Sequence, residues 1–126
     1  MIPVPPLITT TELEAAAGGQ LKLAQFACDD DTGVPDATIL AGVIQRASDR
    51  AAGILLSAFT VDQIVQLATD DADVRGCIVD IALGFLGRRK TEFFDSTSGQ
   101  YPFHTLLCDG EKALKGKRAG DPRLAA

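Results

Sequence analysis

The sequence predicts an all-α protein: a small helical bundle that forms a single domain of 126 residues. Aromatic residues make up only 6% of the chain and Trp is absent, so the core must consist mainly of Leu, Ile, Val and Ala. This composition favours closely packed helices over a β-sandwich. In two long segments, moreover, apolar residues recur at steps of three and four, which is the period of a helix with one buried face.

An extended N-terminal arm is predicted for residues 1–8, because prolines at positions 3, 5 and 6 exclude a continuous helix. The helical body follows over residues 9–116. Residues 117–126 are polar and contain Gly120 and Pro122, so we expect them to form a flexible tail.

Two short helices begin the helical body. Thr9 and Thr11 each stand three residues before a glutamate, which is the spacing of overlapping capping boxes and predicts a helix over Glu12–Ala17. Gly18-Gly19 ends this helix. The apolar residues that follow predict a second helix over Gln20–Ala27.

A long helix over Asp36–Ser57 is expected to form the spine of the fold. Asp36 follows the acidic loop 29–33 and can cap the first turn, where its carboxylate accepts backbone N–H groups. Gly42 and Gly53 each cost about 1 kcal/mol relative to Ala inside a helix. We expect close approach of a neighbouring helix at these glycines, with a bend at Gly53 as the alternative. The polar face is assigned mainly to Gln45, Arg46, Ser48, Asp49 and Arg50.

Further helices are predicted in the second half of the chain. A brief helix begins at Val61-Asp62, and a second long helix covers Asp71–Arg89, with acidic residues near its N-terminus and a basic cluster at its C-terminus that complement the helix dipole. Residues 91–102 are polar and predict a loop. The last helix is predicted over Pro102–Lys115 and ends at Gly116. Its expected inner face consists of Phe103, Leu106, Leu107, Gly110, Ala113 and Leu114.

The net charge of −5 argues against general binding of nucleic acids, which requires clustered Lys and Arg. The charge is unevenly distributed. Residues 1–87 carry 12 acidic and 4 basic side chains, a net charge of −8, whereas residues 88–126 carry 5 acidic and 8 basic side chains, a net charge of +3. An acidic body with a basic end suits head-to-tail or partner contacts. Two differently solvated faces would give the same pattern.

Neither a catalytic site nor a cofactor or metal site is predicted, and we expect no enzymatic activity. Cys28, Cys77 and Cys108 are widely spaced, so buried reduced thiols are expected. His104 is interpreted as a residue at a helix start rather than as a general base. The loop 29–33 lacks the Gly and Glu positions of an EF-hand in both possible registers. No apolar run approaches the roughly 20 residues of a membrane span, so no membrane partner is expected.

Contacts with a partner are predicted at the basic end of the chain, where the candidates are Arg88, Arg89, Lys90, Tyr101, Lys117, Arg118, Arg123 and Leu124. The cluster at 88–90 has two interpretations. Its positive charge complements the dipole of the preceding helix, or it binds an acidic protein surface or DNA phosphates. A short terminus with an apolar end can also order when it binds a neighbour.

Three segments, taken in their order and spacing, resemble the head–tail connector (neck adaptor) family of Mu-like bacteriophages and prophages. The first leads from the helix at Thr11-Glu12-Leu13 through Asp29-Asp30-Asp31-Thr32-Gly33 to the long helix with Ala47 and Ala51. The second is the helix end that runs from Asp80-Ile81-Ala82 to Arg88-Arg89. The third is Tyr101, followed by a helix with Leu106, Leu107, Gly110, Ala113, Leu114 and Gly116.

The resemblance implies an all-α structural protein of the virion neck, made in the cytoplasm of the bacterial host and without enzymatic activity. It implies a homo-oligomeric ring, a dodecamer, that joins the portal protein to tail-side neck or stopper proteins, with DNA only passing through the lumen. Arg88, Arg89 and the tail after Gly116 would then contact the portal or a neighbouring copy. The alternative is a small helical regulatory or adaptor module that binds a protein partner or DNA through its basic C-terminal part.

Overall fold

The computed structural model describes residues 4–27, 36–56, 58–89 and 103–118, and this part of the chain contains six helices and no strand. In chain order these are α1 (Thr10–Ala17), α2 (Gln20–Ala27), α3 (Ala37–Leu55), α4 (Val61–Asp70), α5 (Ala72–Arg88) and α6 (His104–Arg118). The predicted all-α bundle is therefore confirmed. The predicted loops at 29–33 and 91–102 and the residues after Arg118 lie outside the described part of the chain.

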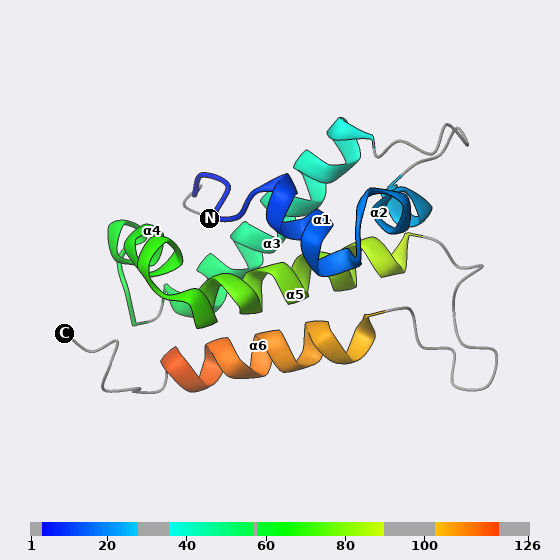
Figure 1. Cartoon of the computed structure of the whole chain (residues 1–126). Coiled ribbons are helices and arrows are strands. Elements are labelled where there is room, and N and C mark those ends of the chain that lie inside the picture. Colours follow the sequence, from blue (N-terminus) through cyan, green and yellow to red (C-terminus); the bar gives the residue numbers. More distant parts are fainter. Residues whose placement is uncertain (1–3, 28–35, 57, 90–102, 119–126) are drawn as a thin grey trace.

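Helix α5, rather than the predicted spine α3, occupies the centre of the bundle (Figure 1). It contacts each of the other five described helices, and every residue from Ile81 to Gly87 is buried. Helix α3 is longer, at 19 residues, but it keeps an exposed face. Residues 81–87 are buried on every side of the helix, so their burial has no helical period, and periodicity did not mark α5 as the central element.

Four of the six described helices begin next to a capping side chain. Thr9 and Glu12 form a capping box before α1, in which the Glu12 N–H donates to Thr9 Oγ1 at 3.2 Å and the Thr9 N–H donates to Glu12 Oε1 at 3.1 Å. Asp36 caps α3 as predicted and accepts from the backbone N–H two residues later at 2.8 Å. Thr60 caps α4, and Asp71 caps α5.

The described part of the N-terminal arm is non-helical, as predicted, and belongs to the core. Val4, Leu7 and Ile8 are buried. Ser48 of α3 anchors the arm, because its Oγ accepts from the Leu7 N–H at 3.0 Å and donates to the Ile44 carbonyl at 2.8 Å. The assignment of Ser48 to a polar face is wrong, since this residue is fully buried. A buried backbone N–H without a helical partner requires an acceptor inside the protein.

We expect Ser48→Ala to lower the free energy of unfolding by roughly 1–3 kcal/mol, because the buried Leu7 N–H would lose its acceptor. Thr69→Ala is the matched control. The Thr69 hydroxyl also donates to a carbonyl four residues earlier, at 2.9 Å, but it is exposed, and we expect a change below about 0.5 kcal/mol. Urea denaturation followed by circular dichroism measures both. An equal effect of the two substitutions would contradict the anchoring role of Ser48.

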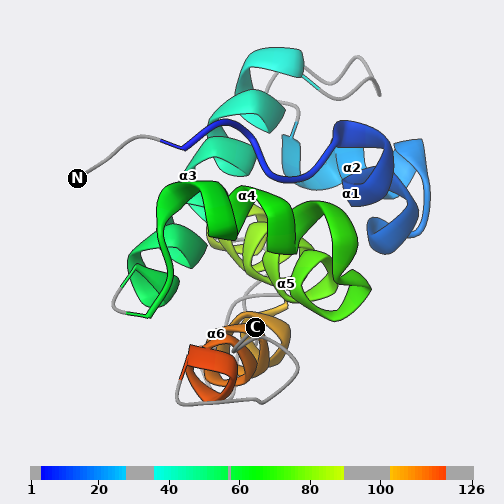
Figure 2. The same cartoon turned by 90° about the vertical axis from the view of Figure 1, so that its left-hand side faces the viewer.

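Helix α6 runs antiparallel to α5 and lies on the side of α5 that faces away from α1 and α2 (Figures 1 and 2). Two glycines permit close packing at this seam. A Cβ added to Gly84 of α5 would lie within 3.0 Å of the Cβ, Cγ and Cδ1 atoms of Leu107, and a Cβ added to Gly110 of α6 would lie 2.8 Å from the Cys77 carbonyl oxygen. Non-bonded carbon atoms pack at about 3.5–4.0 Å, so both helices need glycine at these positions.

The close approach predicted at Gly42 and Gly53 is wrong. Both glycines are exposed, and a Cβ added to either would meet no atom within 4 Å. Helix α3 also continues through Gly53 to Leu55. Inter-helix packing determines which glycines are required, and the sequence gives no direct sign of which helices touch at which residues.

Helix α6 differs from its prediction at its C-terminus and along its inner face. It begins at His104, which confirms this residue as a helix start, but it continues through Gly116 to Arg118. Leu107, Gly110 and Leu114 are buried against the bundle. The predicted inner face includes two residues that do not belong to it, because Leu106 is 37% exposed and Ala113 is also exposed. Since glycines bring the two axes close together, only a narrow stripe of α6 faces α5.

Phe103 lies directly before α6 and has an unusual backbone conformation. Its φ of 64° falls in the left-handed region, which is uncommon for a residue with a bulky side chain. The Phe103 ring packs edge-on against Phe26 of α2, with the ring centroids 5.3 Å apart. The Phe103 carbonyl accepts from the Leu107 N–H at 3.0 Å. Aromatic packing and a first-turn hydrogen bond therefore accompany this unusual backbone conformation.

Candidate interaction surface

Two arginines from different helices flank the ring of Phe85. The guanidinium carbon of Arg46, on α3, lies 4.7 Å from the ring centroid, and that of Arg88, in the last turn of α5, lies 5.5 Å from it. Both arginines are exposed, whereas Phe85 is buried. Attraction between each cation and the ring face holds two like charges at one place. We call Arg46, Phe85 and Arg88 the basic cluster.

The neighbouring Arg50, one turn further along α3, is already paired. Its Nε donates to Glu111 Oε1 of α6 at 2.9 Å, and this carboxylate raises the pKa of Arg50 through the hydrogen bond and through its charge. The pair links α3 to α6 at the surface, where the Arg50 side chain is 49% exposed. Arg50 is therefore not counted as part of the basic cluster.

The predicted contact residues fall into four groups. Arg88 is exposed and belongs to the basic cluster. Arg89 is half-buried, and its Nη1 donates to the Phe26 carbonyl, so it links α5 to α2. Lys117 and Arg118 form the end of α6. Outside the described residues lie Lys90, Tyr101, Arg123 and Leu124.

The sequence does not single out Arg46, because it lies in the acidic part of the chain and apart from any basic run. Its one signal is its place on the polar face of the predicted long helix. Its role depends on α3 crossing α5 next to Phe85, which is a tertiary contact. The sequence alone does not show that Arg46 lies next to Phe85.

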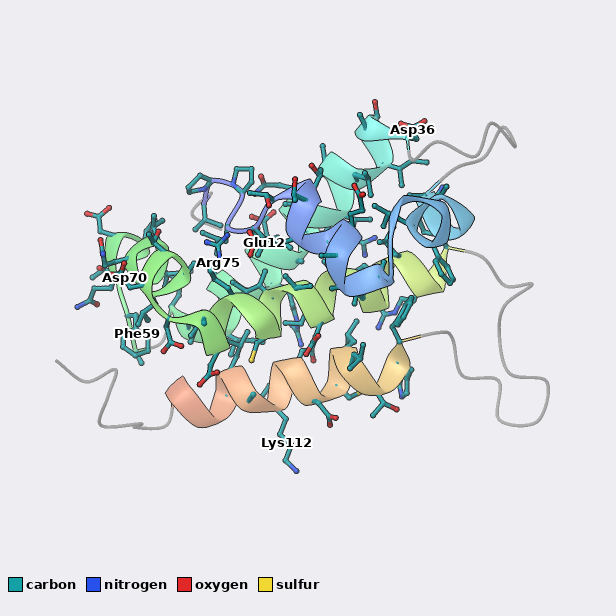
Figure 3. All side chains as sticks on the ribbon, in the orientation of Figure 1. Glu12, Asp36, Phe59, Asp70, Arg75 and Lys112 are labelled. Carbon is teal, nitrogen blue, oxygen red and sulfur yellow. The ribbon has the colours of Figure 1, made fainter. Side chains whose placement is uncertain are left out.

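Exposed carboxylates gather near the other end of α5. Asp62 and Asp70 lie on α4, which contains no Lys or Arg, and Asp73 lies in the first turn of α5. Figure 3 shows Asp70 at the end of the molecule that α4 forms, with Phe59 at the same end. We call Asp62, Asp70 and Asp73 the acidic face. Since α5 has 17 residues, roughly 25 Å separate its two ends.

Two further carboxylates meet at the α5–α6 seam. Burial of Asp80, on α5, raises the pKa of its carboxyl, and the negative charge of Asp109 on α6 adds to this effect. Asp80 is half-buried and lies next to Gly110, whose added Cβ would be 3.4 Å from the Asp80 Cβ. The close packing at Gly110 therefore holds a carboxylate in an unfavourable place at neutral pH.

We expect Asp80→Asn to raise the free energy of unfolding at pH 7. The folded-state pKa lies above the unfolded-state value of about 3.9, so the contribution of Asp80 to stability decreases as the pH rises from about 4 through the folded-state pKa. The gain should disappear near pH 3, where the carboxyl is neutral in both states. Urea denaturation at the two pH values measures this difference, and a gain of equal size at both would count against it. The control Asp62→Asn, at an exposed site, should give no gain at pH 7.

The remaining candidates from the sequence do not converge on one site. His104 Nε2 lies 3.7 Å from Cys108 Sγ one turn further along α6. Cys108 is exposed and Cys77 is half-buried, so the expectation of buried thiols is wrong for Cys108, which lies beside the narrow inner stripe of α6. Cys28 lies outside the described residues. Within the described ranges, no three His, Cys, Asp or Glu residues are grouped as a metal ion would require.

None of the helices in the described part of the chain combines the length and the apolar character that crossing a bilayer demands.

Comparisons of the chain with protein-family models, with curated proteins and with solved structures gave no match. A functional assignment therefore depends on the geometry described above and on the resemblance carried by the three sequence segments.

Proposed function

We propose that this protein is a structural virion protein, a head–tail connector of a tailed bacteriophage, which forms a homo-oligomeric ring between the portal and the tail-side neck proteins. The resemblance of three segments to the connector family motivates this proposal, and the all-α bundle agrees with the fold that the resemblance implies. The observation that carries it is the placement of opposite charges at the two ends of α5.

Complementary surfaces at opposite ends of a molecule favour contacts between the head of one copy and the tail of the next. Such a heterologous contact produces a ring when the rotation between copies closes, and a filament when it does not. Two copies lying antiparallel could instead satisfy both charged ends within a dimer. The mass in solution distinguishes these arrangements.

Multi-angle light scattering of the protein, alone and mixed with a candidate portal protein, tests the proposal, and negative-stain images show the shape of the assembly. We expect rings, formed spontaneously or on the portal, with a mass many times that of the 13.2 kDa chain. A 13.2 kDa monomer that does not bind the portal would contradict the connector function. Binding of that monomer to duplex DNA with a steep salt dependence would favour the regulatory module instead.

A further inference from the structure

We propose that α6 is a detachable helix, which leaves the bundle of α1–α5 as one unit while those helices stay folded, and that the carboxylates of Asp80 and Asp109 at the α5–α6 seam promote its release. The chain then has two folded states, one with α6 docked and one with α6 free, and a lower pH favours the docked state. This property of α6 does not depend on the proposed ring.

Helix α6 makes a narrow contact with the rest of the molecule. It lies on the side of α5 that faces away from α1 and α2, and it packs against α5 and α3 (Figures 1 and 2). Between His104 and Gly116, the buried residues are Leu107, Gly110 and Leu114. In α5, by comparison, ten residues are buried. Since hydrophobic stabilisation is roughly proportional to the buried apolar area, α6 is held less firmly than α5.

A repulsive pair of carboxylates lies within this narrow contact. Asp80 of α5 is half-buried, and its Cβ lies 3.4 Å from the position of a Cβ added to Gly110, so α6 packs directly beside it. Burial raises the pKa of the Asp80 carboxyl, and the negative charge of Asp109 on α6 raises it further. When α6 leaves, Asp80 returns to water and the two charges separate. The ionised carboxylates therefore favour the free state of α6.

No other charge among the described residues offsets this repulsion. Arg50 of α3 pairs with Glu111 of α6, but its side chain is 49% exposed, and such surface pairs contribute little to stability. Arg75 of α5 bonds to Glu12 of α1. Helix α4 contains no Lys or Arg. Lys112 of α6 points away from the bundle (Figure 3).

The backbone directly before α6 also favours release. Phe103 has a φ of 64°, and a residue with a side chain is strained in this left-handed region. In the docked state its ring packs edge-on against Phe26 of α2, which accompanies the strained conformation. Release of α6 allows Phe103 to return to an ordinary φ. Docking of α6 must therefore overcome strain at its first turn as well as repulsion at its seam.

Native-state hydrogen exchange of the full-length chain, measured at increasing urea concentrations, tests whether α6 opens separately. We expect the amides of α6 to show lower protection and a shallower urea dependence than those of residues 81–87, because release of one helix exposes less surface than global unfolding does. Equal protection and equal urea dependence in the two segments would overturn the proposal, since α6 would then open only together with the whole bundle.

Asp80→Asn tests the role of the carboxylates. We expect it to raise the protection of α6 several-fold at pH 7, and the ratio to the original chain should fall toward 1 as the pH is lowered to about 4, where the carboxyl becomes neutral in the docked state. Asp109→Asn should have a smaller effect in the same direction, because burial is the larger cause of the raised Asp80 pKa.

Asp62→Asn is the matched control, because it removes one negative charge at an exposed site on α4. We expect it to leave the protection of α6 unchanged. Circular dichroism checks the helical content of every variant. If neither Asp80→Asn nor Asp109→Asn changes the protection of α6, then α6 opens by fraying without leaving α5, and the proposal is overturned.

Discussion

We expect Gly84→Ala to lower the free energy of unfolding by roughly 2 kcal/mol, which is the usual range for adding a methyl group to a tightly packed interface. The new Cβ would overlap the Cβ, Cγ and Cδ1 atoms of Leu107. The Leu107 Cβ is fixed to the backbone of α6, so a rotamer change of Leu107 cannot remove the overlap. The two helices must therefore move apart. Urea denaturation followed by circular dichroism measures the loss.

Gly76→Ala is the matched control for this prediction, because Gly76 lies on the same helix but is exposed and has open space at its Cβ position. Here the higher helix propensity of Ala should raise the free energy of unfolding by up to about 1 kcal/mol. Gly84→Ala/Leu107→Ala should remain destabilised, since the Leu107 Cβ stays in place. A gain in stability from Gly84→Ala would show that the seam tolerates a side chain.

Arg75→Ala is expected to lower the free energy of unfolding by roughly 2 kcal/mol, because one side chain bonds to two other helices. Figure 3 shows Arg75 and Glu12 side by side. The Arg75 Nε donates to Glu12 Oε2 at 3.0 Å, and its Nη1 donates to the Ala68 carbonyl at 2.8 Å. Its side chain is only 29% exposed, so these interactions are partly shielded from water. Thermal and urea denaturation of the full-length variant measure the effect.

Arg50→Ala provides the comparison for Arg75→Ala. Arg50 also forms an ion pair between helices, but its side chain is 49% exposed, and surface pairs contribute about 0–1 kcal/mol. Combining Arg75→Ala with Glu12→Gln in a double-mutant cycle isolates the coupling of the pair. Equal decreases in the free energy of unfolding for Arg50→Ala and Arg75→Ala would show that partial burial does not strengthen the Arg75–Glu12 pair.

The ion pair of Arg75 also gives stability a defined pH dependence. The hydrogen bond from Arg75 is the largest influence on Glu12 and lowers the pKa of its carboxyl. The contribution of Glu12 is therefore present above the ordinary glutamate pKa of about 4.3 and is lost as the pH falls through the lower folded-state pKa. The contribution of Asp80 to stability has the opposite pH dependence, because it decreases as the pH rises from about 4 through the raised folded-state pKa of its carboxyl.

Features encoded locally could be predicted from the sequence. Thr9 with Glu12 marks the start of α1, and Asp36 and Asp71 mark the starts of α3 and α5, because a capping side chain bonds to backbone within three residues of itself. The bounds of α2 agree with the prediction for the same reason: Gly18-Gly19 precedes that helix, and its own apolar residues define it.

Features that depend on distant contacts could not be predicted in this way. Ser48 is buried because the N-terminal arm crosses it, and the sequence around Ser48 does not show that crossing. Gly84 and Gly42 are both glycines inside predicted helices, but only Gly84 faces another helix closely. In the candidate interaction surface, Arg88 was predicted from its basic run, whereas Arg46 joins it only through the packing of α3 on α5.

The continuous burial of residues 81–87 in α5 has a mechanical consequence. Amide hydrogens in residues 81–87 can exchange with solvent only when the helices around them open together, so this segment should resist local unfolding longest. The two charged surfaces lie at the ends of the same helix. In the proposed ring, tension between one copy and the next would therefore pass along α5, the helix that unfolds last. The rest of the chain would bear little of this tension.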